Sequence, residues 1–211
     1  RIGKNTRESR PASRPMDRLE ALDAWLRRTL GGQAFTLAPA SADASFRRYF
    51  RVSSEGRTWV AMDAPPGRED CRPFVKVASL MRGAGVHVPE IVAQDLAQGF
   101  LLLSDLGART YLQAFDGANE DRLFRDATRA LVDWQAASRE GELPPYDEAL
   151  LRRELSLFPE WYVGRHLGAT LDAQESAHLE KVFGRILASN LAEPRVFVHR
   201  DFMPRNLMVS E

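Results

Sequence analysis

Three polar residues near the end of the chain, His199, Asp201 and Asn206, stand at a spacing that could support phosphoryl transfer. A carboxylate can accept the proton of an attacking hydroxyl, and an amide oxygen can ligate the magnesium ion that neutralises phosphate charge. This chemistry depends on positioning rather than on a covalent intermediate, so both groups must be held rigidly. Asp201 and His199 are therefore the catalytic candidates, and Asn206 is the candidate metal ligand.

Two short apolar runs flank these residues. Residues 196–198 read VFV and residues 207–209 read LMV, which predicts two buried strands with the polar turn clamped between them. The alternative is an ordinary tight turn, in which Asp201 and Asn206 bond to backbone groups and His199 packs in the core. Fixed spacing between two predicted strands favours the catalytic interpretation.

The run at residues 199–206, HRDFMPRN, matches the kinase catalytic-loop pattern H-R-D-x-x-x-x-N. In that loop the Asp receives the proton of the acceptor hydroxyl and the Asn holds a magnesium ion. Pro204 extends the pattern to H-x-D-x-x-P-x-N, which resembles the aminoglycoside and choline phosphotransferase branch of kinase-like enzymes. We therefore expect a small-molecule kinase rather than a protein kinase.

Composition argues against several other classes. Lys+Arg and Asp+Glu both number 29, so the chain has no net positive charge to attract nucleic acid or an anionic membrane. No apolar run reaches the ~18 residues of a membrane span. Residues 1–15 hold five basic residues against one acid, which predicts a disordered basic leader rather than a secretory signal. Nucleic-acid contact by this leader is the alternative, although no aromatic residues interleave its charges. Cys71 is the only cysteine, which favours a reducing cytoplasm.

A sheet is predicted in the first half of the chain. Strand-like runs cover residues 34–39, 46–53 and 58–64, with a hairpin turn at residues 54–57. Small residues at 40–45 would let backbone N–H groups approach phosphate oxygens, so Ser45 is a nucleotide-binding candidate. The glycine-rich G-x-G-x-x-G is absent, and a plain polar loop is the alternative.

The second and third predicted strands contain two unusual charges. Alternation puts Arg48 among apolar neighbours, where it needs an anionic partner, and this makes it a candidate phosphate contact. A solvated edge-strand arginine is the alternative. Residues 60–63 read VAMD, where kinases usually carry V-A-I-K with its phosphate-binding lysine. Asp63 cannot neutralise phosphate, so that role must pass to Arg48, Lys76 or magnesium, and Asp63 could itself pair with a nearby arginine.

A nucleotide-binding hinge is predicted after the fifth strand. A helix over residues 69–84 occupies the place of the kinase αC helix, and strands follow at 90–94 and 99–104. Extended chain beside an apolar slot can bind adenine through its backbone, which makes Leu103 and Asp105 the hinge candidates. A strand that simply enters a turn is the alternative.

The remaining sequence has helical periodicity. Asp147 is expected to cap one helix, and Asp172 with Glu175 forms a capping box for another. Residues 158–166 read FPEWYVGRH, where the proline should break or kink a helix. Because aromatic faces and charged hydrogen-bonding groups often hold sugars, Glu160, Trp161 and Arg165 are candidates for an acceptor pocket. An amphipathic helix end is the alternative.

Several segments together resemble the bacterial anomeric sugar kinases that phosphorylate N-acetylmuramate and N-acetylglucosamine in cell-wall recycling. The matching segments are residues 43–52 (DASFRRYFRV), 62–66 (MDAPP), 99–107, 158–168 and 199–208 (HRDFMPRNLM), within a resemblance spanning residues 16–211. The resemblance implies an α+β, protein-kinase-like two-lobed fold with an antiparallel-sheet N-lobe and a mainly helical C-lobe. It also implies ATP and Mg²⁺ as cofactors, Asp201 as base and Asn206 as a magnesium ligand, and MDAPP looks normal in that branch.

The resemblance also implies a domain plan. We expect a leader at residues 1–15, a nucleotide-binding lobe at 16–105 and a helical lobe with the catalytic loop at 106–211. The family's second magnesium-binding Asp should follow Leu207, yet the sequence stops at Glu211, so the chain resembles the front part of a longer enzyme and should be a poor catalyst alone. The expected protein is a cytoplasmic monomer whose partner is a small-molecule sugar, with no nucleic acid and no membrane.

Two rival functions remain open. One is a kinase for another small substrate, such as an aminoglycoside or choline, which an acid-lined pocket would favour and Arg165 mildly opposes. The other is a catalytically silent nucleotide-binding regulator, which Asp63 in place of lysine suggests. A substrate panel separates these possibilities.

Overall fold

The computed structural model describes residues 15–42 and 46–210 of the 211-residue chain, and its contacts divide into two compact units. The sheet unit takes its described residues from Arg1–Gly83, His87–Asp116 and Pro204–Glu211. The helical unit consists of Ala84–Val86 and Gly117–Met203. This division by contacts differs from the lobes expected at 16–105 and 106–211, which remain a prediction.

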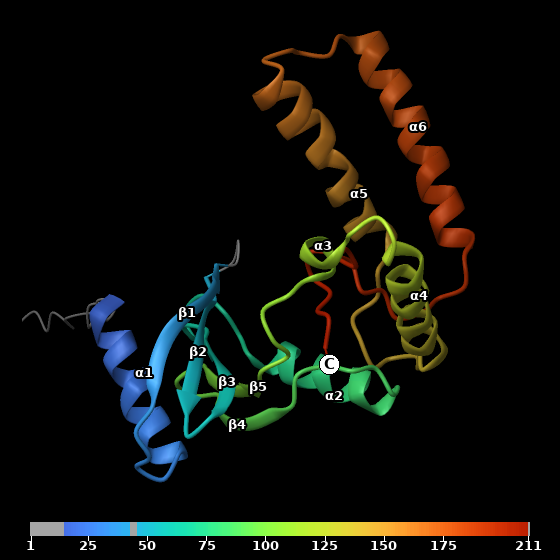
Figure 1. The fold of residues 1–211 in the computed structure, drawn as a ribbon. Helices are drawn as coiled ribbons and strands as arrows, with labels where there is room; N and C mark the ends of the chain where they lie inside the picture. The colour runs from blue at the N-terminus through green and yellow to red at the C-terminus, as the bar shows by residue number, and fades with distance from the viewer. Residues whose placement is uncertain (1–14, 43–45, 211) are drawn as a thin grey trace, which may run out of the picture. The chain divides into compact units, whose positions relative to one another are not determined.

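The sheet unit is built on a five-stranded antiparallel sheet in the order β1-β2-β3-β5-β4 (Figure 1). The strands are β1 (Thr36–Ala42), β2 (Arg48–Ser54), β3 (Arg57–Asp63), β4 (Ile91–Asp95) and β5 (Phe100–Ser104). The expected hairpin joins β2 to β3 through Glu55 and Gly56, both at positive φ, which is the backbone that a tight two-residue hairpin turn needs. The sheet predicted from period-2 alternation is confirmed.

One helix packs on each face of this sheet. Helix α1 (Pro15–Thr29) buries Leu22 and Leu26 completely, and each such side chain contributes about 1.5–3 kcal/mol. Its partners on the sheet include Ala61 and Phe100. The neighbouring residue in β3, Met62, faces the other way because side chains alternate along a strand. There α2 (Arg72–Gly83) packs against the second apolar cluster, which comprises Met62, Ala64, Cys71, Leu101 and Leu103 with Phe74 and Val75 of α2.

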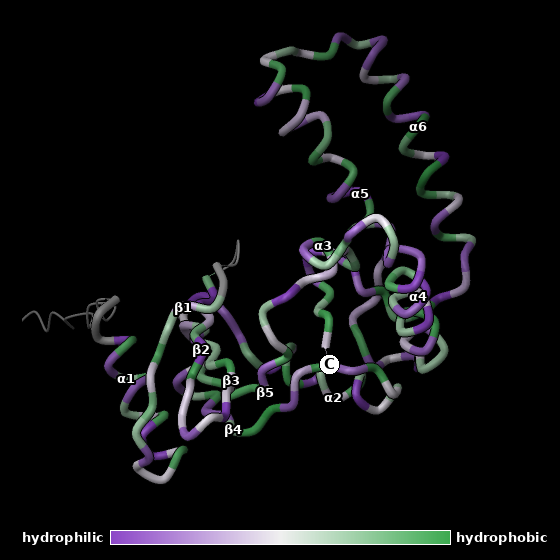
Figure 2. The backbone as a smooth tube through the Cα atoms, in the orientation of Figure 1, coloured by the Kyte–Doolittle hydropathy of each residue, from purple (hydrophilic) through white to green (hydrophobic). Residues whose placement is uncertain are grey.

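The helical unit contains α4 (Glu120–Ala136), α5 (Glu148–Leu157), the π-helix η1 (Phe158–His166) and α6 (Ala173–Ala192), whereas the short α3 (Tyr111–Ala114) belongs to the sheet unit. Both predicted caps are confirmed: Asp147 accepts from the Leu150 N–H, and Asp172 and Glu175 form a reciprocal capping box. Figure 2 shows hydrophobic and hydrophilic residues alternating along α5 and α6, as amphipathic helices require. None of the described helices is long and apolar enough to cross a membrane.

The predicted break or kink at Pro159 is not a break: the α-helix gives way to a π-helix beside this residue. Helix α5 passes directly into η1, and the Leu167 N–H donates to the Tyr162 carbonyl at 2.9 Å, the five-residue step of a π-helix. Pro159 lies in the first turn of η1. Backbone N–H groups in the first turn of a helix have no carbonyl partner within the helix, so the N–H that proline lacks costs little there.

The two strands predicted around the catalytic loop are also wrong. Residues 196–198 form no strand; only Phe197 is buried, and its N–H donates to the Ser138 hydroxyl at 2.7 Å. On the other side Met208 forms a single isolated antiparallel bridge with Thr110. A strand exists only where a neighbouring backbone supplies a ladder. Here the Tyr111 N–H bonds to Leu207 O and the Val209 N–H to Arg109 O, and these two bonds close one bridge without extending into a ladder.

Candidate active site

The catalytic loop begins with a half-buried histidine. The ring of Phe202 meets the His199 ring edge-on at a centroid distance of 5.2 Å. Among the described residues, the buried His199 Nδ1 has no hydrogen-bond partner. Burial lowers the pKa of His199, and the neighbouring Asp201 carboxylate opposes this effect. The imidazole is therefore neutral at neutral pH. Asp201, two residues further on, is exposed.

Between these two residues, Arg200 adopts a left-handed backbone with φ of 72°. A residue with a Cβ pays about 1–2 kcal/mol for this conformation. The strain sits at the step that sets the direction of Asp201, which is where active sites often hold strained backbone.

The second half of the motif belongs to the other compact unit. Pro204 and the residues after it cluster with the sheet unit, whereas His199 and Asp201 cluster with the helical unit. Backbone bonds fix this tail: the Leu112 N–H donates to Pro204 O at 3.1 Å and the Tyr111 N–H to Leu207 O at 2.8 Å. Asn206 lies between these two anchors and is exposed.

The side-chain amide of Asn206 is the kind of oxygen ligand that magnesium accepts in a complex with a nucleotide. Magnesium keeps several waters and takes few protein ligands when substrate phosphates complete its shell. No group of three or more His, Cys, Asp or Glu side chains in the described ranges could hold a metal ion by itself. Asn206 as a magnesium ligand therefore remains a prediction from the sequence.

The hinge candidates lie at the end of β5. Leu103 is buried between β3 and β4, with Val60 and Ile91 as its register partners. The carboxylate of Asp105 accepts from Arg51 Nε at 2.6 Å, from Arg51 Nη2 at 3.1 Å and from the Gly107 N–H at 2.9 Å. Burial would raise the pKa of Asp105, but these donors outweigh burial and lower it. The segment after β5 is thus fixed as a charged turn.

The two unusual charges of β2 and β3 meet. Arg48 and Asp63 are register partners, and Arg48 Nε donates to Asp63 Oδ2 at 3.0 Å. Arg18 of α1 pairs with the other carboxylate oxygen and also donates to Gln98 O at 2.9 Å. Asp63 is 0% exposed, whereas the Arg18 and Arg48 side chains are 17% and 38% exposed. The acid that replaces the kinase lysine is therefore a buried clasp between α1 and the sheet, and Arg48 lies on the α1-covered face.

The three acceptor candidates share the π-helix η1. Arg165 lies over the Trp161 ring, with its guanidinium carbon 4.4 Å from the ring centroid, which is a cation–π contact. Trp161 is exposed, and so is Glu160. Beside them, Tyr162 stacks between the rings of Phe158 and His166 at centroid distances of 5.4 and 5.5 Å. The segment presents a largely exposed surface of aromatic rings and charges.

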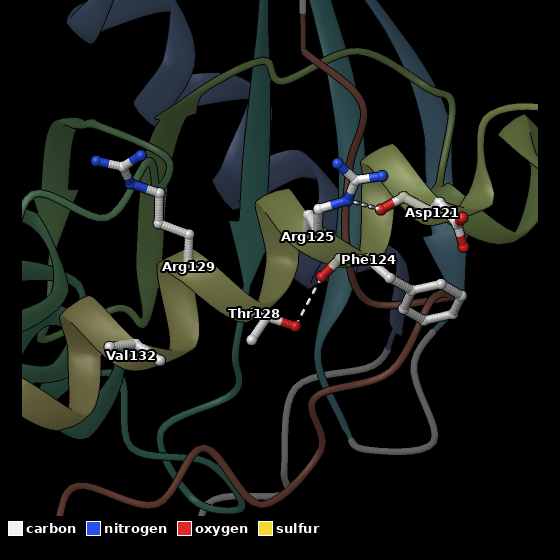
Figure 3. A pocket seen from close by; sticks show the side chains of 6 residues that line it. All are labelled: Asp121, Phe124, Arg125, Thr128, Arg129 and Val132. Carbon is white, nitrogen blue, oxygen red and sulfur yellow. Dashed lines mark hydrogen bonds between the residues drawn. The ribbon is translucent and has the colours of Figure 1, made fainter.

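A shallow hollow on the helical unit contains none of the predicted site residues. Figure 3 shows its lining along one face of α4. The lining residues are Asp121, Phe124, Arg125, Thr128, Arg129 and Val132. Arg125 and Thr128 donate back to the carbonyls of Asp121 and Phe124, so these polar groups serve the helix itself. Ser45, the remaining nucleotide-binding candidate, lies outside the described residues.

Sequence reasoning missed the arginine that binds the hinge acid. Arg51 pairs with Val60 across β2 and β3, and Val60 pairs with Leu103 across β3 and β5. This register brings Arg51 within reach of Asp105, which is 54 residues away in sequence. Strand order and register decide the contact, and the alternation pattern alone contains neither.

The family of the chain follows from its sequence between residues 36 and 211, which matches the family model described as "Phosphotransferase enzyme family". The chain belongs to the phosphotransferase enzyme family. The matched region includes the sheet, the segment after β5, η1 and the HRDFMPRN loop, so the family match extends into both compact units.

Two curated relatives of this phosphotransferase chain bear the same name. A Pseudomonas aeruginosa protein named N-acetylmuramate/N-acetylglucosamine kinase is 59% identical over 175 residues, covering 83% of this chain and 52% of that protein. Its namesake in Pseudomonas putida is 51% identical over 203 residues, covering 92% of this chain and 60% of that protein. The chain therefore spans only about half to three-fifths of the length of these relatives.

A solved structure confirms the expected fold. The apo form of a thermostable mutant of an aminoglycoside phosphotransferase matches this phosphotransferase chain with a TM-score of 0.58 at 16% identity, covering 89% of this chain and 67% of that one. The α+β, kinase-like fold predicted from the sequence is thus confirmed, and a likeness at this identity concerns the fold alone.

Proposed function

We propose that the protein containing this chain transfers the γ-phosphoryl group of ATP to the anomeric hydroxyl of N-acetylmuramate or N-acetylglucosamine. The observation that carries the proposal is the loop His199-Arg200-Asp201 with Asn206, in a chain 59% and 51% identical to proteins named N-acetylmuramate/N-acetylglucosamine kinase. The product is a sugar 1-phosphate, which suits a role in cell-wall recycling.

Asp201 is the proposed base. As the anomeric oxygen bonds to the γ-phosphorus, the bond from that phosphorus to the β–γ bridging oxygen breaks and ADP leaves. The hydroxyl proton passes to the Asp201 carboxylate and then to solvent. The transition state carries little covalent participation by the protein, so the exposed carboxylate must be aimed accurately. We propose that the neutral His199, which meets the Phe202 ring of the same loop edge-on, helps to hold the loop in place.

Nucleotide binding is proposed for the sheet unit. The backbone at Leu103 and Asp105 would meet adenine, and Ser45 and Arg48 would meet phosphate oxygens. Arg48 pairs with Asp63, whereas Leu103 pairs with Val60, so Arg48 and Leu103 are three residue positions apart in the strand direction, about 10 Å. They are also two strand spacings apart across the sheet, again about 10 Å. Arg48→Met should raise the KM for ATP, and an unchanged KM would assign Arg48 to the clasp alone.

The family typically uses a divalent metal, and we propose Mg²⁺ with Asn206 as one ligand. When bound, the ion would neutralise charge on the nucleotide phosphates. Asn206→Ala should therefore raise the magnesium concentration needed for half-maximal turnover, and an unchanged requirement would remove Asn206 from the metal site.

Glu160, Trp161 and Arg165 are the proposed acceptor contacts. The exposed Trp161 ring offers an apolar face for the sugar, and the charged groups beside it offer hydrogen bonds to hydroxyl or acetamido groups. We further propose a monomer in the cytoplasm, where ATP is available and the one cysteine of this chain stays reduced.

The test is a substrate panel with radiolabelled ATP and the full-length gene product. N-acetylmuramate and N-acetylglucosamine should be labelled, whereas labelling of an aminoglycoside or choline alone would move the function to another small-molecule kinase. Asp201→Asn should lower turnover by about 10²–10⁴-fold and leave nucleotide binding intact. Nucleotide binding with no acceptor labelled would instead favour the silent regulator that Asp63 suggests.

A further inference from the structure

The strained step of the catalytic loop is held by two residues far away in the sequence. Arg200 Nη2 donates to Glu154 Oε1 of α5 at 2.7 Å, across 46 residues. The guanidinium carbon of Arg200 also lies 5.5 Å from the ring centroid of Tyr146. Tyr146 donates its hydroxyl hydrogen to the second oxygen of Glu154. All three residues belong to the helical unit, so one carboxylate holds both the loop and the aromatic ring beside it.

These contacts explain how the left-handed backbone persists. Only Arg200 and Glu55 among the described non-glycine residues have positive φ, and Glu55 sits in a hairpin turn that requires it. No hairpin surrounds Arg200, so its strained backbone must be held by side-chain contacts. The charge-assisted hydrogen bond to Glu154 and the cation–π contact with Tyr146 are contacts of this kind.

The Glu154 carboxylate stays ionised at neutral pH. The Tyr146 hydroxyl lowers the pKa of Glu154, against the opposing effect of burial and with a further contribution from Arg200. Conversely, the Glu154 carboxylate raises the pKa of Tyr146. Since 54% of the Arg200 side chain and 35% of the Glu154 side chain are exposed, the pair adds little to global stability. Its effect should appear in local geometry.

We propose that Glu154 is a positioning residue which, through Arg200, fixes the turn that aims Asp201. The inference rests on the proposed function, in which Asp201 is the base. Helix α5 continues directly into η1, which carries Glu160, Trp161 and Arg165, so Glu154 joins the loop of the base to the segment of the proposed acceptor contacts.

The experiment uses the full-length gene product with Glu154→Ala and Glu154→Gln. Glu154→Ala should lower kcat by about 10–100-fold, the scale expected from a small misplacement of a catalytic group, with the KM for ATP nearly unchanged. Glu154→Gln retains an acceptor oxygen and should lose less. In the double variant Glu154→Ala/Arg200→Ala, the losses should not add, because both changes remove the same contact.

A matched control lies on the same helix. Glu148 forms an exposed ion pair with Arg152 at 2.9 Å and touches no part of the catalytic loop in the contacts of the described residues. Glu148→Ala should leave kcat unchanged. Amide hydrogen exchange supplies a readout independent of activity: Glu154→Ala should speed exchange at residues 198–203 about tenfold or more, and Glu148→Ala should not.

The two proposals fail separately. If Glu154→Ala leaves kcat or exchange of the loop as in the wild type, while Asp201→Asn is inactive, the positioning role is overturned and the kinase proposal stands. If the unmodified protein labels no sugar, the proposed function fails, and the exchange measurement still decides whether Glu154 holds the loop. Should Glu154→Ala fail to fold, the glutamine variant carries the same comparison.

Discussion

Replacing Asp63 by lysine, the residue that kinases usually carry at this strand position, should damage the protein rather than improve it. Asp63 is 0% exposed and pairs with both Arg18 and Arg48. A lysine there would put three cations together under α1, with no carboxylate among them.

The magnitude follows from the burial of the three groups. Removing one partner of a buried ion pair typically costs 3–5 kcal/mol, because the other charge stays behind. Arg48 is 38% exposed and can turn toward water, so leaving it without Asp63 adds less to the loss of stability than leaving Arg18 does. We expect about 3 kcal/mol for Asp63→Ala and about 5 kcal/mol or more for Asp63→Lys, since lysine adds repulsion. At 2–4 °C per kcal/mol, the alanine variant should melt roughly 6–12 °C lower.

The assay is thermal unfolding of the full-length gene product, with Asp23→Ala as control. Asp23 forms an ion pair with Arg27 one turn along α1, but the Arg27 and Asp23 side chains are 63% and 38% exposed. That exposed pair should contribute little to the free energy of unfolding. If Asp63→Lys melts with the wild type or with the control, or raises kcat, the argument that this position is a structural clasp is refuted.

Three further changes test other parts of the structure. Gly99→Ala should destabilise the protein by at least about 2 kcal/mol, because at φ of 75° an added Cβ would lie 1.8 Å from Ala64 O. The control Gly56→Ala has a similar φ of 77°, but its Cβ would meet nothing within 4 Å, so it should cost only about 1 kcal/mol. Equal urea midpoints for the two variants would contradict the clash at Gly99. Burial raises the pKa of the Cys71 thiol, so a thiol reagent at neutral pH should label Cys71 only after unfolding, and mass spectrometry of the native protein would reveal any exception. Burial lowers the folded-state pKa of His199, so as the pH falls the unfolded chain binds a proton before the folded protein does, and the free energy of unfolding should decrease below about pH 6.5. Urea titrations at pH 7 and pH 5.5 measure this decrease, and it should be smaller in His199→Asn. The same decrease in the variant and the wild type would exclude His199 as its source.

Local patterns were sufficient for the elements themselves. Period-2 alternation predicts the sheet strands, and the caps at Asp147 and Asp172 mark helix starts correctly, because these signals depend on residues within a few positions of each other. The same reasoning failed at residues 196–198 and 207–209, where short apolar runs look like strands but find no ladder. The spacing of His199, Asp201 and Asn206 likewise needs no tertiary information, and it points to a phosphotransferase family that the comparison confirms.

Long-range pairing is what only the tertiary structure decided. Asp63 could be read from the sequence as the loss of the kinase lysine, or as one member of an ion-pair clasp. The clasp depends on Arg18, which is 45 residues away, and on the strand register that sets Arg48 opposite Asp63. Arg51 reaches Asp105 and Glu154 reaches Arg200 for the same reason. The sequence by itself determined which chemistry the chain carries, since motif spacing is local. The fold determined which charges neutralise one another, because a buried charge is stabilised by whatever partner the packing brings within about 3 Å, regardless of its place in the chain.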